Sequence, residues 1–294
     1  MKTVKLIRYD AFADTPGMGN PCGVVFDDTL TPEEMQAVAA KAGFTECAFL
    51  CPSETADLRL RFFMPGKETP LCGHGTVCAI SAFMAGQPAA PRLLSAETGA
   101  GILSLGWEPD TRRVVMEQAN AQFEPFEGDL PALMAAIGLG MENLDPRWPV
   151  LYGSTGAWTV ILPICSLEAF GRMQPQNKLF ASILTAHPGA SVHPICTQVL
   201  HPECTLHGRH FSSSSSGTVE DPVTGTACGV MAAYYLAHMP ALHGGSSSIS
   251  LLIEQGQDMG LDGKVQAWAE AQPDGIHVKI AGSAIPGKEF SLTI

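Results

Sequence analysis

The sequence predicts an α+β protein made of two similar halves, and three observations lead to this prediction. The chain has 294 residues, a length that suggests about two domains at roughly 150 residues each. Segments with the pattern of strands outnumber segments with the pattern of helices along the whole chain. In addition, a strand, a polar turn and a glycine precede an apolar helix once in each part of the chain.

The first part of the chain combines many strand signals with two helix signals. Thr31 and Glu34 form a capping box around Pro32, which favours a helix beginning there, and Gly43 favours its end. Residues 74–85 are small and apolar and predict a second helix. Strands are predicted over residues 4–12, 22–26, 46–51, 56–64, 92–98, 101–107 and 112–118.

The second part begins where the composition changes after Gln118. Residues 119–130 differ in composition from the preceding strands and contain proline and glycine, so they predict a linker. Helices are predicted over residues 131–138, 166–173, 178–185 and 226–238. Strands are predicted within residues 150–164, 193–201 and 205–212 and in the C-terminal tail, and the five serines at 212–216 predict a polar loop.

The internal repeat joins two glycine-led helix starts. RFF (61–63) precedes CGHG (72–75), and RHF (209–211) precedes TGTA (224–227) across a longer loop. From the residues alone, chance similarity explains this as well as a duplication does. If the repeat is real, two helix N-termini in facing halves offer unpaired N–H groups to one anionic substrate, such as a carboxylate. The alternative is two ordinary buried helices entered by glycine turns.

Charge and composition exclude several classes of function. Seventeen Lys and Arg residues against 29 Asp and Glu residues give a net charge of −12, which opposes nucleic acids and anionic membranes as partners. Apolar residues make up 46% of the chain, enough for a folded core. We find neither the apolar run of a signal peptide nor about 20 consecutive apolar residues that could span a bilayer. A cytoplasmic location is therefore expected.

The cysteines and histidines are candidate residues for disulfides or a metal site. Nine cysteines without a CxxC pair argue against a disulfide framework or a zinc ribbon, and small buried thiols in a reducing compartment are expected. Residues 187–210 are rich in possible ligands, but their spacing matches no standard zinc pattern and strand alternation would scatter them. We therefore expect no metal. These ligands are His187, His193, Cys196, His201, Cys204, His207 and His210.

Four longer motifs occur in order along nearly the full chain. They are YDAF (9–12) with GNPCGVV (19–25), TECAF (45–49), PLCGHGT (70–76) and VEDPVTGTACG (219–229). Weaker motifs are STG (154–156), EQG (254–256) and GSA (282–284). Together these motifs resemble the phenazine-biosynthesis PhzF-like family, which is related in fold to diaminopimelate epimerase. No single motif is specific, but their combination and order are.

The resemblance implies a diaminopimelate-epimerase-like fold. This is an α+β fold of two pseudo-symmetric domains, each a curved, mostly antiparallel sheet around a central helix, with a cleft between them. The central helices would start near His74 and Thr226. The implied domains are residues 1–118, completed by a C-terminal strand at 285–294, and residues 119–284. The family also suggests a homodimer.

The resemblance further implies a cofactor-independent isomerase that moves a proton on a small carboxylate-bearing, amino-acid-like or cyclic substrate. A glutamate on the strand of TECAF would be the acid/base, because a carboxylate removes a C–H proton and returns it elsewhere on the same molecule. No metal or organic cofactor is implied. The implied catalytic residues are Glu46, His74 and Asp221, and the implied substrate-binding residues are Asn20, Gly73, Gly225 and Thr226.

Two alternative functions remain open at this point. Related two-base racemases and epimerases use one thiol from each half; Cys72 stands at the first position, but Thr224 stands at the second. A hydroxyl has a pKa far above the roughly 8.5 of a thiol, so this pair favours Glu46 as the base. The other alternative is a binding protein that keeps the cleft without turnover. The substrate, and whether Cys72 takes part in catalysis, stay open.

Overall fold

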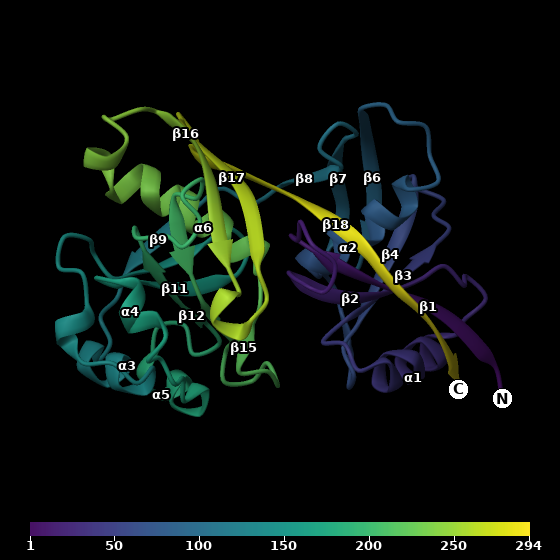
Figure 1. The fold of residues 1–294 in the computed structure, drawn as a ribbon, viewed down its shortest axis with the longest axis horizontal. Coiled ribbons are helices and arrows are strands. Elements are labelled where there is room, and N and C mark those ends of the chain that lie inside the picture. Colours follow the sequence, from purple (N-terminus) through teal and green to yellow (C-terminus); the bar gives the residue numbers. More distant parts are fainter. The chain divides into compact units, whose positions relative to one another are not determined.

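The computed structural model describes all 294 residues and divides into two compact units (Figure 1). Unit 1 comprises Met1–Glu117 and Ala281–Ile294, and unit 2 comprises Gln118–Ile280. The chain thus leaves unit 1, builds unit 2 and returns. The bounds expected from the sequence place this return at residue 285, whereas the structure has it at Ala281. No helix of the chain is long and apolar enough to cross a membrane.

Unit 1 consists of a mostly antiparallel sheet and two helices. The helices are α1 (Pro32–Ala42) and α2 (Gly73–Met84). The strands are β1 (Thr3–Ala11), β2 (Asn20–Val25), β3 (Cys47–Cys51), β4 (Leu58–Phe63), β5 (Glu68–Thr69), β6 (Arg92–Thr98), β7 (Gly101–Glu108) and β8 (Arg113–Glu117), with the second part of β18 (Gly275–Thr293).

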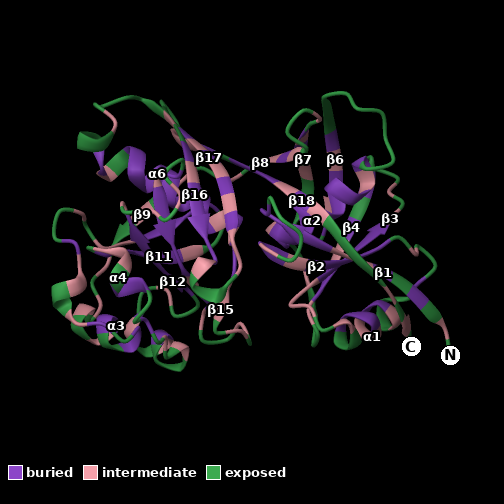
Figure 2. Cartoon of the chain, in the orientation of Figure 1, coloured by how far each residue is buried: buried purple, intermediate pink, exposed green.

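Strand β1 is the centre of the pairing in unit 1, because it lies antiparallel to both β2 and β18. From there β2 continues parallel to β3, β3 antiparallel to β4, and β4 parallel to β6, which forms an antiparallel meander with β7 and β8. Helix α2 packs on β1, β2 and β3, and ten of its twelve residues are buried. It is therefore the central helix of this unit (Figure 2).

Helix α1 forms where the sequence predicts it. The Thr31 hydroxyl accepts a hydrogen bond from the Glu34 backbone N–H at 3.3 Å, and the Glu34 carboxylate accepts one from the Thr31 N–H at 2.9 Å. Pro32 occupies the first turn, and Gly43 ends the helix at φ 77°. Because its buried residues lie on one face, α1 covers a satellite core with Phe49 and Phe63.

Unit 2 contains the remaining strands and more helices. Its helices are α3 (Leu130–Ala136), η1 (Met141–Asn143), α4 (Leu167–Phe170), η2 (Asn177–Leu179), α5 (Phe180–Ile183), α6 (Gly225–His238), η3 (Pro240–Leu242) and η4 (Gln257–Met259). Its strands are β9 (Gln122–Pro125), β10 (Leu151–Ser154), β11 (Trp158–Pro163), β12 (Ser191–Cys196), β13 (Leu206–Gly208), β14 (His210–Phe211), β15 (Glu220–Asp221), β16 (Ser248–Gln255) and β17 (Gly263–Gln272), with the first part of β18.

Helix α6 is the central helix of unit 2. Eleven of its fourteen residues are buried, and it packs on β10, β16 and β17. The sheet is again mostly antiparallel, with parallel pairs only between β11 and β12 and between β13 and β16. The short helices α3, α4 and α5 contribute to a second core around Tyr152, Phe170 and Phe180. Each unit is thus a sheet with a buried helix, which confirms the predicted α+β class.

Two local expectations are wrong, and two predicted helices are present but shorter than expected. The predicted linker at 119–130 contains β9, which pairs antiparallel with β10. The strand predicted over 193–201 ends at Cys196, because the N–H groups of Leu200 and His201 donate to the buried Glu254 carboxylate instead of to a neighbouring strand. The two short helices predicted at 166–173 and 178–185 have only four α-helical residues each.

Candidate functional site

Three chemically active side chains of unit 1 converge at the start of α2. Cys72 is the N-cap residue, His74 is the second helical residue, and Glu46 immediately precedes β3. The Nε2 atom of His74 lies 3.5 Å from Oε2 of Glu46, and its Nδ1 atom lies 3.5 Å from Sγ of Cys72. The His74 side chain is 8% exposed and that of Glu46 is 18% exposed. A carboxylate with some access to solvent therefore faces a buried imidazole.

The sheet determines the position of Glu46. The sequence suggests that Glu46 lies on a strand, whereas in the structure it lies just before β3. Its carbonyl accepts a hydrogen bond from the Gly23 N–H of β2 at 3.3 Å, which extends the parallel pairing of β2 and β3 by one residue. A Cβ at position 23 would lie 2.7 Å from Leu6 and 2.9 Å from the Cys47 sulfur. Only glycine therefore allows this close approach of the strands.

The Cys72 thiol is held by the helix that it caps. Its sulfur accepts a hydrogen bond from the Gly75 N–H at 3.3 Å and so caps the first turn of α2. The sulfur lies 3.5 Å from the Nδ1 atom of His74 and 3.8 Å from its Nε2 atom. Ligand atoms of Glu46, Cys72 and His74 lie within 4.8 Å of one another, close enough to hold a metal ion.

The other residues of unit 1 assigned from the resemblance lie on the same elements. Gly73 is the first residue of α2, between Cys72 and His74. Asn20 begins β2, is fully buried and stands opposite Ala11 of β1. The preceding Gly19 has φ 68°, and a Cβ there would lie 2.2 Å from the Ala11 carbonyl oxygen. The GNP motif thus marks a turn that only glycine can make.

A second set of assigned residues lies in unit 2, at the start of α6. Asp221 ends β15, a short turn follows, and Gly225 and Thr226 open the helix. Thr224 occupies the N-cap position, as Cys72 does in α2, but its side chain accepts no capping hydrogen bond. Its hydroxyl instead donates to the Asp221 carboxylate. The two glycine-led helix starts therefore differ in how their N-cap side chains are used.

Two glutamines near this helix start were not singled out from the sequence. Gln255, the last residue of β16, donates to the Asp221 carbonyl at 2.9 Å and accepts from the Thr224 N–H at 3.3 Å. Gln118 accepts from the Thr155 hydroxyl at 2.6 Å, and Thr155 also lies 3.3 Å from the Thr226 carbonyl oxygen. The weak motifs EQG and STG, which contain Gln255 and Thr155, are the only sequence signal of these contacts.

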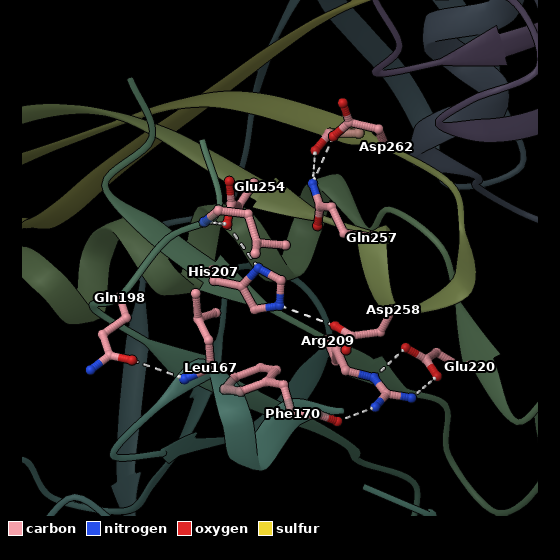
Figure 3. Close-up of polar contacts among 12 residues, drawn as sticks. Leu167, Phe170, Gln198, His207, Arg209, Glu220, Glu254, Gln257, Asp258 and Asp262 are labelled. Carbon is pink, nitrogen blue, oxygen red and sulfur yellow. Dashed lines mark hydrogen bonds and ion pairs between the residues drawn. The ribbon is translucent and has the colours of Figure 1, made fainter. Parts of the chain in front are cut away.

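A buried charged network lies next to these residues on the same strands (Figure 3). His207 of β13 contacts Glu254 of β16 at 2.9 Å through Nδ1 and Asp258 of η4 at 3.1 Å through Nε2. Arg209 holds Glu220 of β15 through two hydrogen bonds of 2.8 and 2.6 Å. The residues that follow Glu254 and Glu220 are Gln255 and Asp221. The network therefore anchors both strand ends that carry the Asp221–Gln255 contact.

Burial and pairing act in opposite directions on the groups of this network. Burial alone lowers the pKa of His207, but hydrogen bonds with Asp258 and Glu254 outweigh it and raise that pKa above its ordinary value. Burial likewise raises the pKa of Glu254, while its hydrogen bonds with His207 and two backbone N–H groups bring it below the usual value. The hydrogen bonds thus favour the charged forms of both groups.

The histidines of residues 187–210 contact separate partners and form no common metal site. His187 contacts Glu124, His201 contacts Asp262, and His207 belongs to the network just described. His193 and His210 face each other at 3.1 Å between their Nδ1 atoms, and burial lowers the pKa of both. All nine cysteines are free. Burial raises the pKa of Cys204 to about 12, which keeps that thiol protonated.

Comparison with known proteins identifies the family. A family model described as "phenazine biosynthesis-like protein" (PhzC-PhzF) matches residues 9–289. The chain belongs to the PhzC-PhzF family. A Bacillus subtilis relative named "uncharacterized isomerase YfhB" is 46% identical over 291 residues, which cover 97% of each chain. The trans-2,3-dihydro-3-hydroxyanthranilate isomerase of Pseudomonas aeruginosa is 30% identical over 289 residues, 95% of each chain. These relatives show that the PhzC-PhzF protein described here is an isomerase.

Solved structures agree with this assignment. The crystal structure of a Bacillus anthracis phenazine biosynthesis protein of the PhzF family matches with a TM-score of 0.95 and 44% identity over 100% of both chains. A hydroxyproline epimerase from Agrobacterium vitis matches with a TM-score of 0.60 at 11% identity, covering 99% of this chain and 92% of that chain. The second match concerns the fold alone. It confirms the epimerase-like architecture expected of a PhzC-PhzF protein.

Proposed function

We propose that this isomerase moves a proton between two positions of a small carboxylate-bearing substrate, amino-acid-like or cyclic, with Glu46 as the acid/base. The contact between the Glu46 carboxylate and the His74 imidazole, 3.5 Å apart at the start of the central helix, is the observation that carries the proposal. A carboxylate beside an imidazole is the arrangement that general acid–base catalysis uses. The step itself needs no cofactor, because the same group takes and returns the proton.

The chemistry balances within the substrate. Glu46 takes a proton from a C–H bond, and the electron pair of that bond moves into a conjugated system that ends at another carbon of the substrate. The protonated Glu46 then delivers the proton there, so the product is an isomer. His74 orients the carboxylate or shares its proton. In this proposal Asp221 binds a polar group of the substrate, and the backbone of Gly73, Gly225 and Thr226 stabilises the developing negative charge.

The identity of the N-cap residues favours this proposal over two-thiol racemisation. Cys72 and Thr224 occupy equivalent positions, one residue before α2 and α6. The Thr224 hydroxyl donates a hydrogen bond to the Asp221 carboxylate, so Thr224 acts as a hydrogen-bond donor. A hydroxyl with so high a pKa is no substitute for a thiolate base. A single carboxylate that serves both proton transfers removes the need for the second thiol.

Deuterium incorporation from solvent tests the proposal. The protein is incubated in D2O with trans-2,3-dihydro-3-hydroxyanthranilate, the substrate class named for the Pseudomonas relative, and with a panel of amino and hydroxy acids, and exchange at carbon is followed by NMR. With a substrate that exchanges, Glu46→Gln should reduce the exchange rate at least about 100-fold, whereas Cys72→Ser should keep most of it. If Cys72→Ser abolishes exchange and Glu46→Gln does not, Cys72 is the base and the proposal is wrong.

A further inference from the structure

Gln255 holds a buried position that the proposed mechanism does not use. It is 1% exposed, and its amide reaches across from β16 to the turn between β15 and α6. We propose that Gln255 is a positioning residue, which fixes the Asp221 backbone and the Thr224 hydroxyl in the geometry that substrate binding requires. This inference rests on the proposed function in one respect, the role of Asp221.

The contacts of Gln255 determine which way its amide points. The Asp221 carbonyl only accepts hydrogen bonds, so the atom 2.9 Å from it must be the Nε2 donor. The Thr224 backbone N–H only donates, so the atom 3.3 Å from it must be the Oε1 acceptor. A flipped amide would lose both bonds. The Gln255 amide therefore has one possible orientation, in which it bridges Asp221 and Thr224.

The Gln255 amide also determines where the hydroxyl hydrogen of Thr224 points. Nε2 of Gln255 lies 3.4 Å from the Thr224 hydroxyl oxygen and donates to it, so the hydroxyl hydrogen is turned toward the Asp221 carboxylate. A threonine at an N-cap ordinarily accepts a hydrogen bond from the first turn of its helix. Thr224 does not, and the first-turn N–H groups of α6 are thus uncapped by this side chain.

Both chain neighbours of Gln255 are held in place. Glu254 is fully buried and paired with His207 (Figure 3). Gly256 has φ 100°, and a Cβ there would lie 2.2 Å from the Leu261 carbonyl oxygen and 2.9 Å from that of Pro222. The end of β16 therefore packs directly on the turn that carries Asp221. Because both neighbours of Gln255 are fixed, we infer that its side chain sets the position of the turn and does not adapt to it.

Amide hydrogen exchange tests the positioning without a substrate. Because Gln255 is the hydrogen-bond acceptor for the Thr224 N–H, Gln255→Leu should raise the exchange rate of that amide at least about tenfold. Gln255→Glu retains an acceptor and should keep the amide protected. Gln266→Leu is the matched control, since Gln266 lies on neighbouring β17 and donates to Ser250 and Leu251. Unchanged exchange at Thr224 in Gln255→Leu would overturn the inference.

The pH profile of turnover separates positioning from a merely structural role. The carboxyl introduced by Gln255→Glu donates to the Asp221 carbonyl only while it is protonated, so proton exchange into the substrate found in the deuterium experiment should fall with rising pH over a range where the wild type is level. A variant with a uniformly lower rate and a wild-type profile would contradict the inference. Asp221→Asn is measured in parallel. If it keeps the wild-type rate while Gln255→Leu releases the Thr224 amide, the positioning stands and the proposed role of Asp221 fails.

Discussion

At the scale of single residues, the thiol and imidazole at the start of α2 owe their placement to a glycine. Gly75 donates its N–H to the Cys72 sulfur, and a Cβ at this position would lie 3.0 Å from that sulfur and 3.1 Å from the Phe62 ring. Phe62 is fully buried in β4 and has no room to withdraw. The glycine therefore lets the helix start pack against the sheet with Cys72 and His74 in contact.

A substitution at this glycine should be costly. Gly75→Ala forces the Cys72 sulfur or the Phe62 ring to move, and we expect it to lower the free energy of unfolding by about 1–3 kcal/mol. Gly86→Ala is the matched control, because a Cβ there meets no atom within 4 Å. Urea unfolding of both variants measures the difference. Equal stability of the two variants would show that the helix start accommodates the added methyl group and would contradict this prediction.

At the scale of elements, the network of His207, Glu254 and Asp258 joins β13, β16 and η4 in unit 2. The contribution of this network to the free energy of unfolding depends on pH. The raised pKa of His207 means that its contribution to stability is present below the unfolded value of about 6.5 and is lost as the pH rises through the higher folded value. Because the pKa values of Glu254 and Asp258 are lowered, the contribution of these carboxylates to stability is lost in acid.

The resulting prediction is a loss of stability in mild base. The free energy of unfolding should decline as the pH rises above about 6.5, and His207→Gln should reduce this decline below about pH 8, where cysteine thiols do not yet titrate. The same variant should lower stability at about pH 6.5 by about 3–5 kcal/mol, since buried carboxylates lose their cation. His277→Gln, in the surface pair with Asp274, should leave the pH dependence as it is. Denaturant titrations between about pH 6.5 and 8 check this, and a wild-type curve that is level over that range would contradict it.

The elements that sequence reasoning located are those with local signals. The capping box of Thr31 and Glu34 and the terminating Gly43 bound α1 within the chain segment itself. Strand β9 was missed because it is held by pairing with β10, about 30 residues away, and its own residues are polar and include proline. Gln255 was missed for the same reason. A single buried glutamine has no periodicity, and its partner Asp221 lies 34 positions earlier.

The same distinction applies to the candidate site. The motif PLCGHGT places Cys72 and His74 together because they are one helix start. The proximity of Glu46 to His74 follows from the pairing of β2 with β3 and from the packing of α2 on both. Only the family resemblance could supply that long-range contact from the sequence. The buried ion pairs of unit 2 have no motif, and the structure alone reveals them.

At the scale of the whole molecule, β18 belongs to both units. Its first part lies in unit 2, and its second part, from Ala281, pairs with β1 from Ala11 back to Thr3. The pairing shifts register between Ile7 and Tyr9, where Pro286 stands opposite Tyr9; an irregularity is where a strand tolerates proline. The backbones of Lys2 and Ile294 also exchange two hydrogen bonds, so the two chain ends lie side by side.

Removal of the returning strand should affect the units unequally. A chain that ends at Ile280 leaves β1 without one partner and removes Phe290 and Leu292 from the core under α1. We expect unit 1 to lose its protection against proteolysis, while unit 2, whose residues are all present, keeps its own. Limited proteolysis with mass spectrometry identifies the surviving fragment. A protected fragment from residues 1–117 would show that β18 is dispensable.

The return of the chain has a consequence for biosynthesis. A ribosome adds residues from the N-terminus onward, so every residue of unit 2 is added before the last strand of unit 1. Unit 1 is therefore begun first but receives its last strand after unit 2 is complete, and β1 lacks one partner until that strand is made. The half that carries the proposed acid/base residue Glu46 is thus the later of the two to have all its residues.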